Sequence, residues 1–353
     1  MASIDNQSNP TRERTPREPT DENAHLKNGQ LKDGIVSTKV SRISGRLVTG
    51  AYKAAAIIAR RLPAPLASVL AQLVAKILGY ALRGRRDQLV MHQERIAGRS
   101  LSPSEQADCV KAAFVSYAQY WVDSFRLTGA STKRVDSEIE VEGSEHVTAA
   151  LALGNGVVMA MPHIGAWDLG GAWVGHHWPL TVVAERLNPP ELFEWFCAQR
   201  KANNINVVPL GPEAGGVLIA ALRRNEVLGL LCDRDIAGGG VEVEFFGEKT
   251  TLPAGPAMFS LRTGAPVLPV VVYQRKGRAA RGVIRPPIAF ERSGKFRADV
   301  AAYTQLIANE LEKLISEAPE QWHVLQPNWP SDPGWTGTKR EPTVEGEPSE
   351  LVL

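Results

Sequence analysis

Short apolar runs of strand length alternate with helical stretches from about residue 135 to residue 316, and this alternation constrains the fold more than any other feature. Such an alternation is typical of βαβ units, in which helices cover a sheet. We therefore expect an α/β fold with a central, largely parallel or mixed sheet covered by helices on both faces. The expected strands are 156–162, 179–185, 205–210, 226–233 and 266–274, and the expected helices are 167–177, 189–204, 215–225, 253–264 and 300–316.

Two further segments have strand character. Residues 241–248 fit a strand or one arm of a hairpin. Residues 282–290 contain Pro286 and Pro287, which have no backbone N–H to donate to a neighbouring strand. Because proline within a sheet is confined to edges and strand ends, we expect this segment to form an edge strand.

The N-terminal part of the chain is expected to be helical, with helices over 66–82 and 103–128. The aromatic residues of the second helix recur at helical spacing, which is typical of a packed face. The first thirty residues are polar and lack the apolar stretch of a secretory signal. The predicted organisation is a disordered tail (1–40), one domain (41–330) with a helical part (41–130) and an α/β core (131–330), and a second disordered tail (331–353).

The segment 66–82 is almost wholly apolar, and basic residues flank it. Twelve basic and only two acidic residues lie between Lys39 and Arg99, although the whole chain has a net charge of only +2. A bilayer-spanning helix needs roughly 20 apolar residues, so this segment is short for a span. It fits either a packing helix of the core or an interfacial helix on an anionic lipid surface.

The stretch "PHIGAWD" (162–168) places a histidine where a strand ends and a helix begins. Reactive groups of open α/β sheets gather beyond the carboxyl ends of the strands. We expect Asp168, in the first helical turn, to hydrogen-bond one ring nitrogen of His163 and leave the other free as a base. Two alternatives are an aspartate that caps the helix beside an incidental histidine, and a metal held by both residues. The metal alternative lacks the third protein ligand that most sites have.

Charged residues also follow two other expected strands. Glu185 and Arg186 follow one strand, while Asp233, Arg234 and Asp235 follow another. Each group taken alone fits a salt bridge or a helix cap. Because the carboxyl ends of parallel strands lie along one edge of a sheet, the groups together predict a single site.

Four blocks in order resemble the phosphatidylinositol mannoside acyltransferases, within the wider lysophospholipid and lipid A acyltransferase superfamily, whose hallmark is His-x4-Asp. The blocks are "PHIGAWD" (162–168), "VVAERLNPPELFEWF" (182–196) with Arg200 after it, "CDRD" (232–235) with "GVEVEFFGEKTTLPAGPA" (240–257), and "WHVLQPNW" (322–329). The resemblance covers about residues 50–330. It implies a peripheral enzyme at the cytoplasmic face of the plasma membrane.

The resemblance implies transfer of a fatty acyl group from acyl-CoA, with palmitoyl-CoA as the expected donor, to the 6-hydroxyl of a mannose of phosphatidylinositol mannosides. His163 would be the general base and Asp168 would orient it. Glu185 falls on the family's site glutamate, which would hold the mannose or its phosphate neighbourhood. Arg200 falls on a site arginine, which suits a phosphate or a partner carboxylate. We group Arg186, Arg234 and Asp235 with them as substrate-binding candidates. Asp233 is a third catalytic candidate. It stands where the family carries glutamate, so its reach to the acceptor or to His163 stays open.

No serine or cysteine stands beside His163 as a nucleophile, so we expect direct transfer without an acyl-enzyme. The three scattered cysteines fit reduced thiols, and no cofactor or metal is expected. Trp322 and His323 are interpreted as packing residues. The expected partners are acyl-CoA, the mannoside and an anionic membrane surface, without nucleic acid. The alternatives are an acyltransferase for a lysophospholipid or another glycolipid, and a non-catalytic basic membrane-binding module.

Overall fold

The computed structural model describes residues 45–81, 83–236 and 238–335. Its centre is a seven-stranded sheet with the strand order β1-β9-β8-β2-β5-β3-β4. The predicted tail 1–40 and residues 336–353 of the second tail lie outside the described residues. The strands of the sheet are β1 (Ile139–Glu142), β2 (Val157–Met161), β3 (Leu180–Ala184), β4 (Ile205–Pro209), β5 (Val227–Leu231), β8 (Val267–Tyr273) and β9 (Ala280–Ile284).

The sheet is mixed, which confirms the predicted α/β class. Strands β8, β2, β5, β3 and β4 are parallel, whereas β9 is antiparallel to β8 and parallel to β1. The expectation of an edge strand over 282–290 is wrong, because β9 lies between β1 and β8. The strand ends at Ile284, so Pro286 and Pro287 fall beyond it and remove no hydrogen bond from the sheet. A separate antiparallel hairpin contains β6 (Val241–Phe245) and β7 (Glu248–Leu252).

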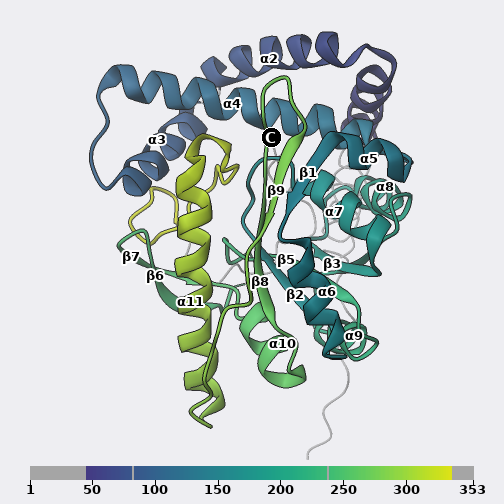
Figure 1. The fold of residues 1–353 in the computed structure, drawn as a ribbon. Coiled ribbons are helices and arrows are strands. Elements are labelled where there is room, and N and C mark those ends of the chain that lie inside the picture. The colour runs from purple at the N-terminus through teal and green to yellow at the C-terminus, as the bar shows by residue number, and fades with distance from the viewer. Residues whose placement is uncertain (1–44, 82, 237, 336–353) are drawn as a thin grey trace, which may run out of the picture. The chain divides into compact units, whose positions relative to one another are not determined.

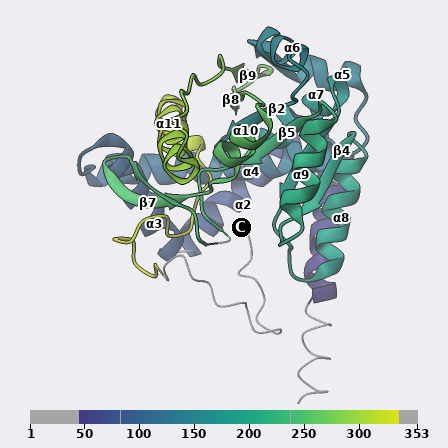
Figure 2. The same cartoon turned by 90° about the horizontal axis from the view of Figure 1, so that it is seen from below.

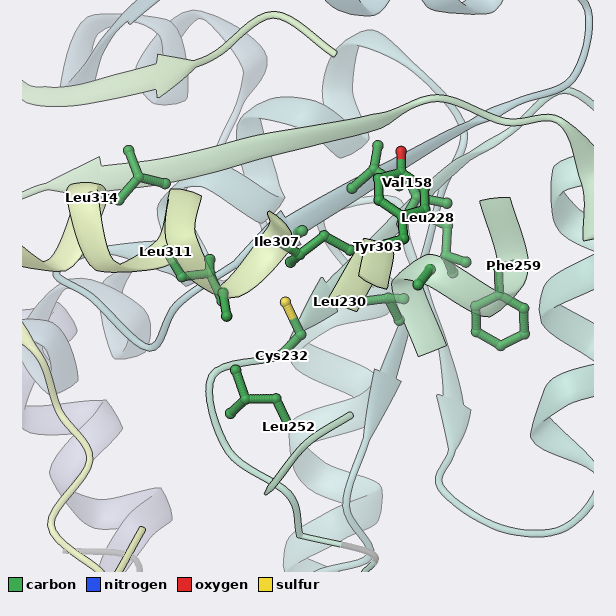
Figure 3. Close-up of a cluster of buried hydrophobic side chains, with 14 of the residues drawn as sticks. Val158, Leu228, Leu230, Cys232, Leu252, Phe259, Tyr303, Ile307, Leu311 and Leu314 are labelled. Carbon is green, nitrogen blue, oxygen red and sulfur yellow. The ribbon is translucent and has the colours of Figure 1, made fainter. Parts of the chain in front are cut away.

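Both faces of the sheet are buried, because successive side chains of a strand point to opposite faces. On one face, Val158 and Ala160 of β2 pack with α9 (Ala214–Arg223), α10 (Gly255–Thr263) and α11 (Phe296–Glu317). Figure 3 shows side chains of α11 directed toward the strands in this cluster. On the other face, Val157 and Met159 pack with α6 (Ser144–Ala152) and α7 (Trp167–His177).

The helical N-terminal part includes residues 45–61, α2 (Ala64–Ala81), α3 (Arg83–Ala97) and α4 (Pro103–Arg126). Ser102 and Glu105 form a capping box at the start of α4, which satisfies two otherwise unpaired backbone N–H groups. Figure 1 shows α2 and α4 side by side across one end of the sheet, and the view from below in Figure 2 shows α9, α10 and α11 on one face of it.

Several large apolar side chains on residues 45–81 are exposed: Leu47, Ile57, Ile58, Leu66, Val69, Leu70, Leu73, Val74 and Ile77. We call these nine residues the apolar face. A buried side of α2, with Ala67 and Ala75, packs inward. Among the described residues, every helix falls short of the length and apolarity needed to cross a bilayer.

The compact structure continues past residue 330, where the sequence predicts a tail. Asp332 is buried, and its carboxylate accepts hydrogen bonds from His92 Nε2 at 3.2 Å and from Arg95 at 3.1 Å. The same carboxylate accepts the backbone N–H groups of Asn328 and Trp329. The hydrogen bonds from His92 and Arg95 therefore hold the segment after α11 against α3.

Candidate active site

His163 and Asp233 meet at the carboxyl ends of two neighbouring parallel strands. The register pairs Met161 at the end of β2 with Leu231 at the end of β5. His163 and Asp233 each follow two residues later, so they stand at the same level. His163 Nδ1 lies 2.6 Å from Asp233 Oδ1, and the backbone N–H of His163 donates to Asp233 Oδ2 at 2.7 Å.

Asp233 is fully buried and held from several directions. The indole Nε1–H of Trp322 donates to Asp233 Oδ2 at 2.7 Å, and the side-chain amide of Asn328 donates to the backbone carbonyl of Asp233 at 3.1 Å. Burial opposes ionisation of this carboxyl, but the charge and hydrogen bonds of His163 and the hydrogen bond from Trp322 outweigh it. They hold the pKa of Asp233 below its usual value.

The ionised carboxylate of Asp233 fixes the tautomer of His163. A carboxylate only accepts hydrogen bonds, so the neutral imidazole carries its proton on Nδ1 and presents a lone pair at Nε2. The side chain of His163 is 22% exposed, and Nε2 has no hydrogen-bond partner among the described residues. This arrangement is that of a general base whose free nitrogen can take a proton.

The expected hydrogen bond between Asp168 and His163 is wrong. Asp168 Oδ2 accepts from the hydroxyls of Tyr120 at 2.9 Å and Ser124 at 2.7 Å, and Oδ1 accepts from Arg200 at 3.2 Å. Asp168 lies in the first turn of α7, which directs its carboxylate to α4 and to α8 (Pro190–Lys201). Asp233 takes the place beside the imidazole that the sequence assigned to Asp168.

The Asp168–Arg200 pair instead anchors the start of α7. The side chains of Asp168 and Arg200 are only 16% and 25% exposed. Burial raises the pKa of Asp168, but the Arg200 charge and the hydrogen bonds from Ser124 and Tyr120 lower it by more. The pKa of Asp168 therefore lies below its usual value. Partners from α4 and α8 thus fix the helix that follows His163.

The remaining predicted site residues lie along the same edge of the sheet or in the loop beyond it. Glu185, half-buried, and Arg186, exposed, follow β3, which is the neighbour of β5. Arg234 donates to the side chain of Gln326 at 3.2 Å. Asp235 accepts hydrogen bonds from the backbone N–H groups of Gly238 and Gly240, which organise the loop before β6. The three strands that carry these groups, β2, β5 and β3, are consecutive in the sheet.

A second histidine lies beside the first. The backbone N–H of His323 donates to the carbonyl of His163, and its ring Nε2 lies 2.8 Å from the hydroxyl of Ser116. Burial, together with the proximity of His163, lowers the pKa of His323 to about 3. His323 is therefore neutral at physiological pH.

The hydrogen bond between Trp322 and Asp233 was not predicted, because the sequence pattern indicates only a packing role for Trp322. The two residues are 89 positions apart, and no local pattern connects them. One signal was available for the partner of His163: both His163 and Asp233 stand two residues beyond an apolar strand.

An apolar cavity lies between α7 and the sheet, on the face that Val157 and Met159 cover. Its volume is about 40 Å³, far below the roughly 300–1,000 Å³ of ligand pockets. Met161, two residues before His163, lines it, as do Gly170 of α7 and Gly229 of β5. Every group that lines the cavity surface is apolar.

Within the part of the chain that the structure describes, no three His, Cys, Asp or Glu side chains come together in a way that could hold a metal ion. Asp168 is one of the two ligands of the metal hypothesis, but its carboxylate pairs with Arg200 and does not lie beside His163.

Comparison with known proteins places this site in context. Residues 37–331 match the model of the bacterial lipid A biosynthesis acyltransferase family. A phosphatidylinositol mannoside acyltransferase of Mycolicibacterium smegmatis is 36% identical over 263 residues, which cover 72% of this chain and 83% of the relative. Proteins of the same name from two strains of Mycobacterium tuberculosis are 37% identical over 72% of this chain and 80% of theirs.

Proposed function

The chain belongs to the bacterial lipid A biosynthesis acyltransferase family and is an enzyme of the acyltransferase class, and from that premise we propose that it acylates phosphatidylinositol mannosides. The donor is acyl-CoA, with palmitoyl-CoA as the expected species, and the acceptor is the 6-hydroxyl of a mannose. The names of the relatives support the acceptor class. The observation that carries the chemistry is the pairing of His163 with Asp233, which leaves Nε2 open at the edge of the sheet.

In the proposed reaction, Nε2 of His163 takes the proton of the mannose hydroxyl while the hydroxyl oxygen attacks the thioester carbonyl carbon. The new C–O bond forms and the C–S bond of the thioester breaks. The proton then passes from Nε2 to the departing thiolate of coenzyme A. The carboxylate of Asp233 stabilises the imidazolium that forms between these two transfers, because its charge lies 2.6 Å from Nδ1.

Direct transfer is supported by the state of the nearest thiol. Cys232 precedes Asp233 and is buried, and its Sγ points to the carbonyl of Met161. Burial and the neighbouring charge of Asp233 raise the pKa of this thiol far above its usual value. A thiol held protonated is a poor nucleophile, so the acceptor hydroxyl attacks the donor itself.

Two charged groups have roles other than proton transfer in this proposal. Asp168 acts through the backbone, because it fixes the start of α7 and thereby the segment from Pro162 to Ala166. Glu185 and Arg186 project from the end of β3, one strand away from Asp233, where they can hold the acceptor's polar head.

Residues 45–81 are proposed to bring the enzyme to its lipid acceptor at the cytoplasmic face of the plasma membrane. The nine side chains of the apolar face are exposed, so their apolar area is available for lipid to cover. Lys53, Arg60, Arg61, Lys76 and Arg86 are exposed among or beside them. Basic residues near an anionic leaflet contribute about 1 kcal/mol each, which salt weakens.

The test of the proposed function is release of coenzyme A by the purified full chain with palmitoyl-CoA and one of three acceptors. These are phosphatidylinositol mannosides, a lysophospholipid and a lipid A precursor. Acceptor-dependent release with the mannosides, and a product heavier by one acyl group in mass spectrometry, is the expected result. Turnover with the lysophospholipid alone would assign the alternative substrate class.

A further inference from the structure

We propose that Trp322 is a positioning residue for the general base: its indole N–H fixes which oxygen of Asp233 faces the ring of His163. The inference rests on the proposed role of His163, but it concerns a residue whose indole N–H binds Asp233 instead of the imidazole. Trp322 acts through Asp233, and its contribution is the orientation and charge of that carboxylate.

The hydrogen bonds to Asp233 are divided between its two oxygens. Oδ2 accepts two N–H groups, from Trp322 Nε1 and from the backbone of His163, both at 2.7 Å. Among the residues that the structure describes, Oδ1 accepts only His163 Nδ1, at 2.6 Å. Without Trp322 a single N–H would hold Oδ2, so the carboxylate could turn about its Cβ–Cγ bond and weaken the hydrogen bond to the ring.

Trp322 is itself held rigidly, as a positioning group must be. Its side chain is 2% exposed and packs against the rings of His92 at 5.2 Å and Trp329 at 6.0 Å. Its backbone forms an antiparallel bridge with Ile164, the residue that follows His163. The donor and the imidazole are therefore tied to the same short stretch of backbone.

The effect on proton affinity has a defined direction. With His163 neutral, the pair carries one negative charge, and the Trp322 N–H stabilises that charge. Once the pair takes up a proton it is neutral as a whole, so the N–H stabilises it less. Removing the N–H therefore raises the pH at which the pair becomes protonated, whichever residue holds the proton.

Other titratable groups near the pair do not obscure this effect. Cys232 and His323 face it from β5 and the C-terminal segment, and both stay neutral through the working pH range. His92, whose ring packs against that of Trp322, is paired with the buried Asp332.

The experiment compares Trp322→Phe with Trp329→Phe. Both indoles are almost fully buried in one aromatic cluster, but Trp329 donates to the backbone carbonyl of Phe245 instead of to Asp233. In Trp322→Phe we expect kcat to fall about 10- to 100-fold and the acid limb of the pH–rate profile to move up by about 0.5–1 pH unit. Trp329→Phe should leave the acid limb of the pH–rate profile unchanged, even if the variant is less stable than the wild-type protein.

A second measurement needs neither turnover nor a folded Phe variant. Fluorotryptophan makes the indole N–H a stronger donor, so the labelled wild-type chain should take up the proton on His163 at lower pH. The His163 ring is followed by NMR without substrate, so absence of acyl transfer would overturn the proposed function and leave this test intact. An unchanged titration in labelled protein, or an equal shift of the acid limb in both Phe variants, would overturn the role of Trp322.

Discussion

Replacing Asp233 with asparagine exchanges one carboxylate oxygen for an NH₂ group and is expected to give His163 the wrong tautomer. Two fixed N–H groups, from Trp322 and from the His163 backbone, point at the position of Oδ2. Only the amide oxygen of asparagine can accept them, so its NH₂ group must face Nδ1. Nδ1 must then accept that hydrogen bond, and the ring proton moves to Nε2, where it blocks the uptake of the substrate proton.

The size of the expected loss of activity follows from the energy difference between the two orientations of the asparagine amide. An amide turned the other way would place its NH₂ against two N–H donors and leave them unsatisfied in a buried site. Each unsatisfied buried donor costs about 1–3 kcal/mol, so the orientation with the wrong tautomer is favoured by at least about 2 kcal/mol. The competent tautomer then falls below about one molecule in twenty. The lost carboxylate charge adds to this effect, and we expect kcat to fall ~10³–10⁴-fold, as in serine proteases with the same change.

The assay is single-turnover acyl transfer at pH 7 with saturating donor and acceptor, alongside ¹⁵N NMR of the histidine ring to identify the tautomer. Asp168→Asn is the matched control, because it makes the same change in a neighbouring carboxylate that does not touch His163. We expect the control to lose stability, because the largely buried charge of Arg200 loses its ionic partner, but to keep its turnover within about tenfold of wild type. A folded Asp233→Asn enzyme with turnover within tenfold of wild type, or with the proton still on Nδ1, would refute the reasoning.

Three further predictions follow from the same structure. His163→Ala should lower acyl transfer by ~10²–10⁴-fold with an unchanged circular dichroism spectrum. Hydrogen bonds from His92 and the backbone outweigh burial and hold the pKa of Asp332 well below its unfolded value. The stability that Asp332 contributes is therefore present above about pH 4 and lost as the pH falls, so the Tm deficit of Asp332→Asn at pH 7 should shrink below that pH. The protein should bind anionic vesicles but not neutral ones and be released by high salt, and reversing Arg60, Arg61 and Arg86 to glutamate should weaken binding. Binding that resists salt and carbonate would indicate deep insertion.

The sequence predicts the sheet and the position of His163 because both depend on local patterns. Apolar runs and helical periodicity mark the strands and helices, and a histidine just past a strand must lie at the sheet edge. The position of β9 was not predictable in this way. Pro286 suggested an edge strand, but the strand ends before it, and strand order depends on contacts between distant segments.

The partner of His163 was misassigned because nearness in sequence was taken for nearness in space. Asp168 is five residues away, whereas Asp233 is seventy. In a parallel sheet, residues just past adjacent strands lie side by side, and the β2–β5 register brings Asp233 to the ring. Trp322 could not be assigned at all, since its place beside Asp233 depends on how the segment after α11 folds back across the site.

The His-x4-Asp spacing acquires a different meaning from this geometry: it separates two anchors of one loop. His163 is held by Asp233, and Asp168 is held by Arg200, Tyr120 and Ser124. Between them, Gly165 adopts a left-handed φ of 59°, and an added Cβ would collide with the carbonyl of Val272. The loop must make this turn within four residues to bring the imidazole to the sheet edge and still begin α7. An aspartate at the fifth position therefore stabilises the course of the backbone that presents the base, and the proton chemistry itself belongs to the pair of His163 and Asp233.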